Sequence, residues 1–262
     1  MKEAAFAAKE LGYKDDEEKF QNEFKDFSKY VWNSIERSKT ERELECFAAT
    51  PYQDISATII GNIACFWPCK IIDIDNKRLI EVLNTLYSKY MPNGCWFNRH
   101  IWGAYGPILT WPIANCFVHL RDREKVVRIF DWTLKNGQSS THAWPEGVSP
   151  QTFYGSEGDG YEGWGVAEFL MLLRNMLFLE KDKTLWIAPC IPSKWLKAGS
   201  IITIENIITN FGKYDVKIES DKVNNIIRIN ITPYNDTPKN GYILNSPKKY
   251  HIQPYVCLSD AR

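Results

Sequence analysis

The sequence predicts a mainly α-helical chain, an α/α toroid followed by a small antiparallel domain of β-sandwich type. Apolar residues recur at helical spacing through the first 182 residues. From Thr184 onward, short runs of β-branched residues alternate with turn residues. All ten tryptophans lie between Trp32 and Trp195, which marks a change of composition. We therefore expect a helical domain over residues 1–182 and a β domain over residues 183–262.

The first two helices are expected near the amino end. One covers residues 2–11 and ends before Gly12, a residue type common just after helices. The next begins at the acidic run 15–18, because carboxylates favour the positive end of a helix dipole. Its apolar residues follow at steps of four and three, as one continuous stripe: Phe20, Phe24, Phe27, Val31 and Ile35.

Five more helices are expected over residues 51–72, 76–90, 110–120, 123–134 and 163–179. The last is apolar almost all round, which predicts burial between neighbours. Paired helices joined by loops rich in Trp, Gly and acidic residues favour an α/α toroid. A ring of six helix pairs needs about twelve helices. At roughly 25 residues for each helix with its loop, the first 182 residues hold about half of such a ring. We therefore expect part of a longer enzyme with an N-terminal segment outside this chain; the alternative is a complete, smaller helical domain.

Strands are expected over residues 185–188, 201–207, 215–219, 226–231 and 251–258, separated by Pro, Gly and Asn-Asp turns. They define the predicted C-terminal β domain.

Charge and composition exclude several classes of function. Lys+Arg and Asp+Glu both number 32, so nothing favours nucleic acid or an anionic membrane as a partner. The chain has neither a leader pattern nor an apolar run of transmembrane length, and we expect a cytoplasmic protein. Its seven cysteines are irregularly spaced, and Cys65 and Cys69 have no second pair to complete a zinc site. Buried free thiols, no metal and no cofactor are therefore expected.

Residues 141–170 carry the chemistry. Glu146 stands between Trp144-Pro145 and Gly147, where a helix cannot continue. A glycine-spaced cluster then offers three carboxylates before Trp164 opens the last helix: Glu157, Asp159 and Glu162. Glycoside cleavage needs one protonated and one ionised carboxyl, and indole faces stack on sugar rings. The pattern therefore predicts a site for a sugar substrate.

Glu146 and Asp159 are the predicted catalytic residues. A Pro/Gly-flanked loop can hold Glu146 rigidly as a general base; the alternative is a structural carboxylate that caps a helix or pairs with an arginine. The glycines beside Asp159 permit close approach to a ligand; alternatively, Asp159 caps the helix that follows.

The predicted substrate-binding residues come from two loops. Glu162 and the indoles of Trp144 and Trp164 lie beside the acids, although first-turn acids such as Glu157 and Glu162 often serve only the helix dipole. A second loop, residues 99–106, offers three further side chains: His100, Trp102 and Tyr105. His100 could bond a sugar hydroxyl, and the two aromatic rings could stack on a sugar. Alternatively, the aromatic residues only plug the edge of the barrel.

Residues 141–212 resemble the C-terminal end of six-hairpin glycosidases, a superfamily with an (α/α)6 barrel that includes glucoamylases and bacterial α-L-rhamnosidases. The resemblance lies in Gly-Asp-Gly-Tyr-Glu-Gly-Trp-Gly-Val-Ala-Glu-Phe-Leu at 158–170, Ile-Pro-Ser-Lys-Trp-Leu at 191–196 and Phe-Gly at 211–212. It implies that the Trp-Pro-Glu element supplies Glu146 as general base. This chain has Glu162 at a position where the family has a His, and Gln151 at a position where the family has an Arg.

The resemblance implies hydrolysis of a glycosidic bond in an oligosaccharide or glycoside. In the family the general acid lies well upstream of the base, and no counterpart stands out here. Two other functions remain open: an inverting glycoside phosphorylase on the same barrel, and a non-catalytic carbohydrate-binding or scaffolding remnant that kept the aromatic residues.

Overall fold

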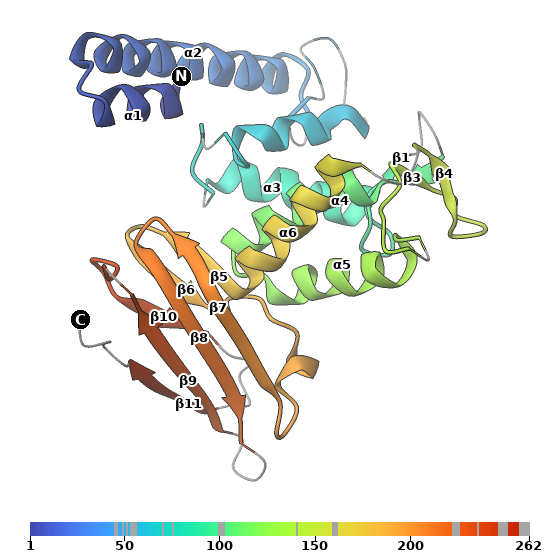
Figure 1. Cartoon of the computed structure of the whole chain (residues 1–262). Helices are drawn as coiled ribbons and strands as arrows, with labels where there is room; N and C mark the ends of the chain where they lie inside the picture. Colours follow the sequence, from blue (N-terminus) through green and yellow to red (C-terminus); the bar gives the residue numbers. More distant parts are fainter. Residues whose placement is uncertain are drawn as a thin grey trace. The chain divides into compact units, whose positions relative to one another are not determined.

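The computed structural model describes residues 1–44, 47–48, 50, 52, 57–69, 71–74, 76–98, 103–139, 141–158, 162–221, 226–234, 236–245 and 251–256. The chain divides into two compact units, Met1–Lys89 and Tyr90–Arg262 (Figure 1). The boundary expected near residue 182 falls inside the second unit and stays a prediction.

The first unit begins with two packed helices, α1 (Lys2–Glu10) and α2 (Lys14–Glu41). Gly12 turns the chain between them in the left-handed region, with φ +80°. A 3-10 helix, η1 (Ala57–Cys65), leads to α3 (Lys77–Thr85), which continues as a π-helix, η2 (Leu86–Tyr90). The helix expected over residues 76–90 is thus confirmed, and the Asn76 side chain caps it by accepting from the Arg78 N–H at 3.0 Å.

Three helices form the centre of the second unit: α4 (Pro107–His119), α5 (Arg123–Asn136) and α6 (Gly163–Leu177). Helix α4 is buried on most of its circumference because it packs against both α5 and α6. The pair expected around residues 121–122 is confirmed, and Asp122 caps α5 by accepting from the Lys125 N–H at 3.2 Å.

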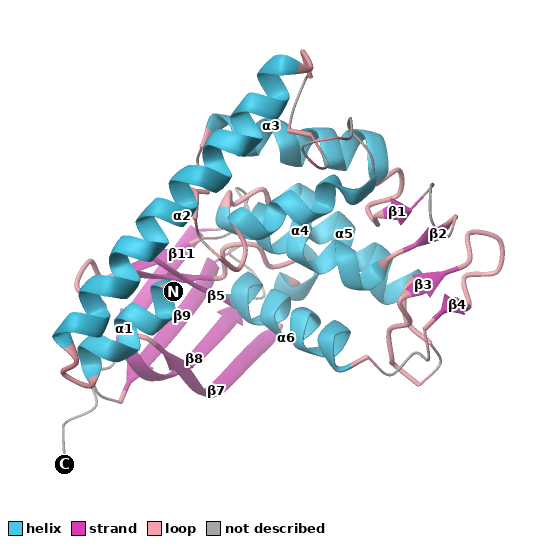
Figure 2. Cartoon of the chain, turned by 90° about the horizontal axis from the view of Figure 1, so that it is seen from above, coloured by secondary structure: helices cyan, strands magenta, loops and turns pink. Residues whose placement is uncertain are grey.

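A four-stranded antiparallel sheet lies at one end of these helices, in the order β1-β2-β3-β4 (Figure 2). Its strands are very short: β1 (Phe97–Asn98), β2 (Ala104–Tyr105), β3 (Gly147–Val148) and β4 (Gly155–Glu157). The sequence shows no strand pattern at these positions. This sheet joins the loop after residue 96 to the loop that carries Glu146.

The C-terminal strands form two further sheets, whose orders are β10-β6-β5 and β11-β9-β8-β7. The strands are β5 (Phe178–Lys181), β6 (Thr184–Ile187), β7 (Ile201–Thr209), β8 (Gly212–Ser220), β9 (Ile226–Pro233), β10 (Tyr242–Leu244) and β11 (His251–Val256). Alternate residues of β8 and β9 pack into one core with Phe178, Leu185 and Ile187. A short 3-10 helix, η3 (Ser193–Leu196), closes that core through Leu196.

The predicted fold class is wrong. The helices described for this chain do not close an α/α ring: α4, α5 and α6 form one group, and short strands occupy the loops between them. The C-terminal sheets are also mixed, because β10 pairs with β6 and β11 pairs with β9 in parallel. Helical periodicity shows which face of a helix is apolar, but many arrangements bury the same faces, so it does not select a toroid.

Helix α6 is less buried than its sequence predicts. One face is buried through Gly165, Leu172 and Met176, but Val166 and Leu170 are exposed. The expectation of burial on all sides is therefore wrong. None of the helices among the described residues has both the length and the apolarity needed to cross a bilayer.

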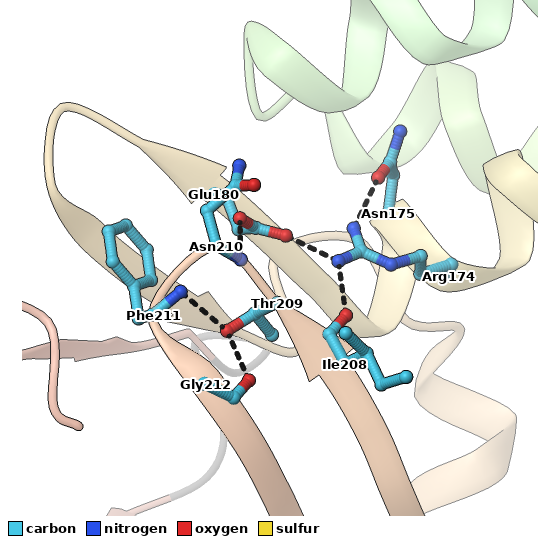
Figure 3. A network of polar contacts seen from close by, with 8 residues as sticks. All are labelled: Arg174, Asn175, Glu180, Ile208, Thr209, Asn210, Phe211 and Gly212. Carbon is cyan, nitrogen blue, oxygen red and sulfur yellow. Dashed lines mark hydrogen bonds and ion pairs between the residues drawn. The ribbon is translucent and has the colours of Figure 1, made fainter. Parts of the chain in front are cut away.

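A polar network ties α6 to the strands that follow it (Figure 3). Arg174 on α6 donates to the carboxylate of Glu180 on β5 and to the Ile208 carbonyl at 3.0 Å. The second oxygen of Glu180 accepts from the Asn210 N–H at 2.8 Å, in the turn between β7 and β8. One carboxylate thus links a helix, a strand and a turn.

We predict that Glu180→Ala lowers the free energy of unfolding by about 2–3 kcal/mol, because the partly buried Arg174 guanidinium and the Asn210 N–H lose their carboxylate acceptor. Glu219→Ala is the matched control: its ion pair with Lys217, at 2.8 Å, is more exposed and should contribute less than about 1 kcal/mol. Denaturant melts at neutral pH measure both values, and equal losses for the two variants would contradict the structural role of Glu180.

The structure describes five of the cysteines, and all five are free thiols. Cys95, Cys116 and Cys190 are buried, as expected, whereas Cys65 is half-buried and Cys69 exposed; Cys46 and Cys257 lie outside the described residues. Burial raises the pKa of the Cys95 thiol and of the Cys190 thiol to about 12. It also raises the pKa of Cys116.

Because only the thiolate reacts, we predict that iodoacetamide at pH 8 labels Cys69 in the native protein. Cys95, Cys116 and Cys190 should become reactive only after denaturation. Peptide mass spectrometry of native and unfolded samples measures this directly. Labelling of Cys95 in the native state as fast as that of Cys69 would contradict the burial described here.

Candidate active site

Glu146 lies at a bend just before strand β3, on the loop that enters the small sheet. Its neighbours Trp144, Pro145 and Gly147 are buried, while Glu146 itself is half-buried. The segment is anchored on both sides: Trp144 packs into the helical core, and Gly147 pairs with Glu157 on β4. A carboxylate fixed in this way has little freedom to move, as a catalytic group requires.

Glycines allow the two strands of this hairpin to approach unusually closely. A Cβ on Gly147 would lie 2.8 Å from the Cβ of Glu157, and a Cβ on Gly155 would lie 3.0 Å from the Cβ of Pro145. Any larger residue at Gly147 would clash, so the glycine spacing seen in the sequence has a steric cause.

Gly158 lies against two of the predicted site residues, Glu146 and Glu162. Its backbone is left-handed, with φ +73°. A Cβ at this position would lie 3.0 Å from the Cβ of Glu146 and 3.2 Å from Oε1 of Glu162. Both acidic side chains therefore converge on the space that only glycine leaves open.

In the described part of the chain, Glu146 neither caps a helix nor pairs with an arginine, whereas Glu162 stands at the N-terminus of α6, as the helix-dipole alternative predicts. No hydrogen bond or ion pair of the Glu146 carboxylate is described there, and a strand, not a helix, follows it. Glu162 occupies the N-cap position of α6, and its carbonyl accepts from the Val166 N–H at 3.2 Å. Its side chain makes no capping bond.

The two tryptophans predicted to bind sugar differ in their surroundings. Trp144 is buried, and its ring packs on Phe169 at 4.4 Å and on Trp111 at 5.9 Å between centroids. Trp164, in the first turn of α6, is 49% exposed. Trp164 is therefore partly accessible, two residues after Glu162 in the sequence, whereas Trp144 anchors the loop.

Tyr105 shares the sheet with the Glu146 loop, since it pairs with Val148 across β2 and β3. Its ring is buried against Trp132, with 4.7 Å between centroids, and its hydroxyl accepts from the Asn93 side chain at 2.8 Å. His100, Trp102 and Asp159 lie outside the described residues, so their predicted roles stay predictions.

Sequence reasoning missed two aromatic residues close to this site. Phe153 and Tyr154, in the loop between β3 and β4, are 42% and 78% exposed. The signal was present: two adjacent aromatic residues stand in a short stretch that otherwise holds Ser, Pro, Gln, Thr and Gly. Large exposed aromatic rings in a turn are candidates for ligand contact, as are the tryptophans beside the acidic residues.

Among the residues that the structure describes, no three His, Cys, Asp or Glu side chains are grouped so as to hold a metal ion.

No protein-family model and no curated protein matches the chain. Two solved structures, both named glycosidase, one wild-type and one a point variant, are similar to it at 12% identity and a TM-score of 0.38. The match covers 47% of this chain and 36% of theirs, so the chain corresponds to about a third of their length. A TM-score this low does not establish a common fold.

We predict that Gly158→Ala displaces Glu146, because the added Cβ would press on the Cβ and backbone nitrogen of that residue. Gly241→Ala is the matched control: its φ is +75°, but its Cβ would meet nothing within 4 Å. Both variants should lose about 1 kcal/mol of stability to backbone strain, with a further loss only at Gly158. Equal melting temperatures for the two variants would show that the close approach is absent.

Proposed function

We propose that this chain carries the hydrolytic site of a glycoside hydrolase, with Glu146 as the general base. The observation that carries the proposal is the placement of Glu146: a half-buried residue, anchored on both sides, that lies against Gly158 as Glu162 does. A carboxylate held in place without a structural partner is what activation of a water molecule needs.

In the proposed reaction, Glu146 accepts a proton from water as the water oxygen forms a bond to the anomeric carbon. The glycosidic C–O bond breaks, and a protonated carboxyl transfers its proton to the leaving oxygen. Asp159 is the proposed second catalytic residue. It lies in sequence directly after Gly158, the residue on which Glu146 and Glu162 converge.

Two described side chains are proposed to hold the sugar. The Glu162 carboxylate can accept hydrogen bonds from sugar hydroxyls, and the positive end of the α6 dipole favours negative charge there. The exposed ring of Trp164 can stack on the apolar face of a sugar. Both groups lie in or just before the first turn of α6, which fixes their spacing.

We predict that Glu146→Gln lowers the rate of glycoside hydrolysis by about 10²-fold or more, since an amide cannot accept the proton. Glu205→Gln, an exposed glutamate on β7, is the control and should keep full activity. The assay uses the natural protein that contains this chain, with a panel of aryl glycosides and oligosaccharides. Melting temperatures show whether each variant folds.

Near-normal turnover by a normally folded Glu146→Gln variant would remove Glu146 from the mechanism. Sugar binding without turnover in the wild-type protein would favour the non-catalytic alternative.

A further inference from the structure

The loop between β3 and β4 is closed tightly by one serine. The Ser149 N–H donates to the Tyr154 carbonyl at 2.9 Å, and the Ser149 carbonyl accepts from the Phe153 N–H at 2.9 Å. The Ser149 hydroxyl oxygen also accepts from the backbone N–H of Gln151 at 3.3 Å. Residues 149–154, named here the hairpin tip, thus have a defined shape without help from a ligand.

Phe153 is held in an unfavourable backbone conformation at this tip, with φ +57°. Its ring lies nearly parallel to Tyr105, at 6.3 Å and 12°, and meets Trp132 edge-on at 6.2 Å. These two rings support Phe153 from behind, while 42% of the residue remains exposed. The result is a fixed aromatic platform with one open face.

The chemistry around the platform fits a neutral sugar. Tyr154, next to it, is 78% exposed. Residues 147–156 contain no charged side chain, although Glu146 and Glu157 flank them. Their uncharged polar groups include the Gln151 amide and the hydroxyls of Thr152 and Ser156, while the Ser149 hydroxyl donates to Oε1 of Gln151 at 2.9 Å. Sugar rings combine an apolar C–H face with a rim of hydroxyls, which matches rings surrounded by uncharged hydrogen-bonding groups.

The tip stands apart from the carboxylates. Two residues, Gly147 and Val148 of β3, separate Glu146 from Ser149, so the Cα atoms of Glu146 and Ser149 lie up to roughly 10 Å apart. The hairpin tip continues beyond Ser149. A ligand that contacts both Glu146 and the tip is therefore expected to be a chain of sugars.

We propose that Phe153 and Tyr154 form a sugar-binding subsite for an extended, neutral oligosaccharide. Its position relative to the cleaved bond rests on the proposed function of Glu146, but binding at the tip does not require hydrolysis. The substrate class is therefore a neutral oligosaccharide of several units, not a single-sugar glycoside.

The test measures binding by the natural protein carrying Glu146→Gln, with calorimetry on neutral oligosaccharides of one to six units and on uronic-acid oligosaccharides of the same lengths. Tyr154→Ala and Phe153→Gly are added in that background; glycine relieves the positive φ and so preserves the loop. Tyr30→Ala is the control, since Tyr30 is 71% exposed on α2 in the other unit.

We expect affinity to rise with length for the neutral series, and each hairpin-tip variant to lose roughly three- to tenfold in affinity for the longer members. Tyr30→Ala should bind as its parent does. Length-dependent binding that neither hairpin-tip variant weakens would overturn the subsite while leaving Glu146 untouched. Preference for the uronic-acid series would overturn the neutral substrate class. Absence of binding throughout this set, together with absence of hydrolysis by the wild-type protein, would overturn the proposed function and the subsite.

Discussion

The candidate site depends on one steric constraint, the absence of side chains at Gly147, Gly155 and Gly158. These glycines let the segment that carries Glu146 lie closer to the returning strand than a Cβ would comfortably allow. Gly158, with its left-handed backbone, lies against both Glu146 and Glu162. A larger residue at this position would press on both acidic residues.

Aromatic packing holds the constrained hairpin to the rest of its unit. Trp144 enters a cluster with Trp111 of α4 and Phe169 of α6, and Gly165 lets α6 approach Ile108 of α4 closely. The loop before Glu146 and the helix after Glu162 are thus fixed to the same core. Such rigid support is what lets unpaired carboxylates keep a defined separation.

Local signals in the sequence predicted most helices and the long strands, because caps at Asn76 and Asp122 and alternation in β8 and β9 act over a few residues. The predicted toroid was wrong because the arrangement of helices depends on contacts between distant segments, which local signals do not report. Strands of two or three residues carry no period, so the sheet that positions Glu146 was missed. The aromatic pair Phe153-Tyr154 was visible in the sequence, but the support of Phe153 by Tyr105 and Trp132 was not, because these residues come from distant segments.

The central claim is that Glu146 and Glu162 face one sugar-binding space. A crystal structure of the natural protein with Glu146→Gln and an uncleaved oligosaccharide tests it most directly. We expect a glycosidic oxygen within reach of the side chain at position 146, with Glu162 bonded to a hydroxyl of the same sugar. An oligosaccharide bound elsewhere, with Glu162 turned into an ion pair, would contradict it.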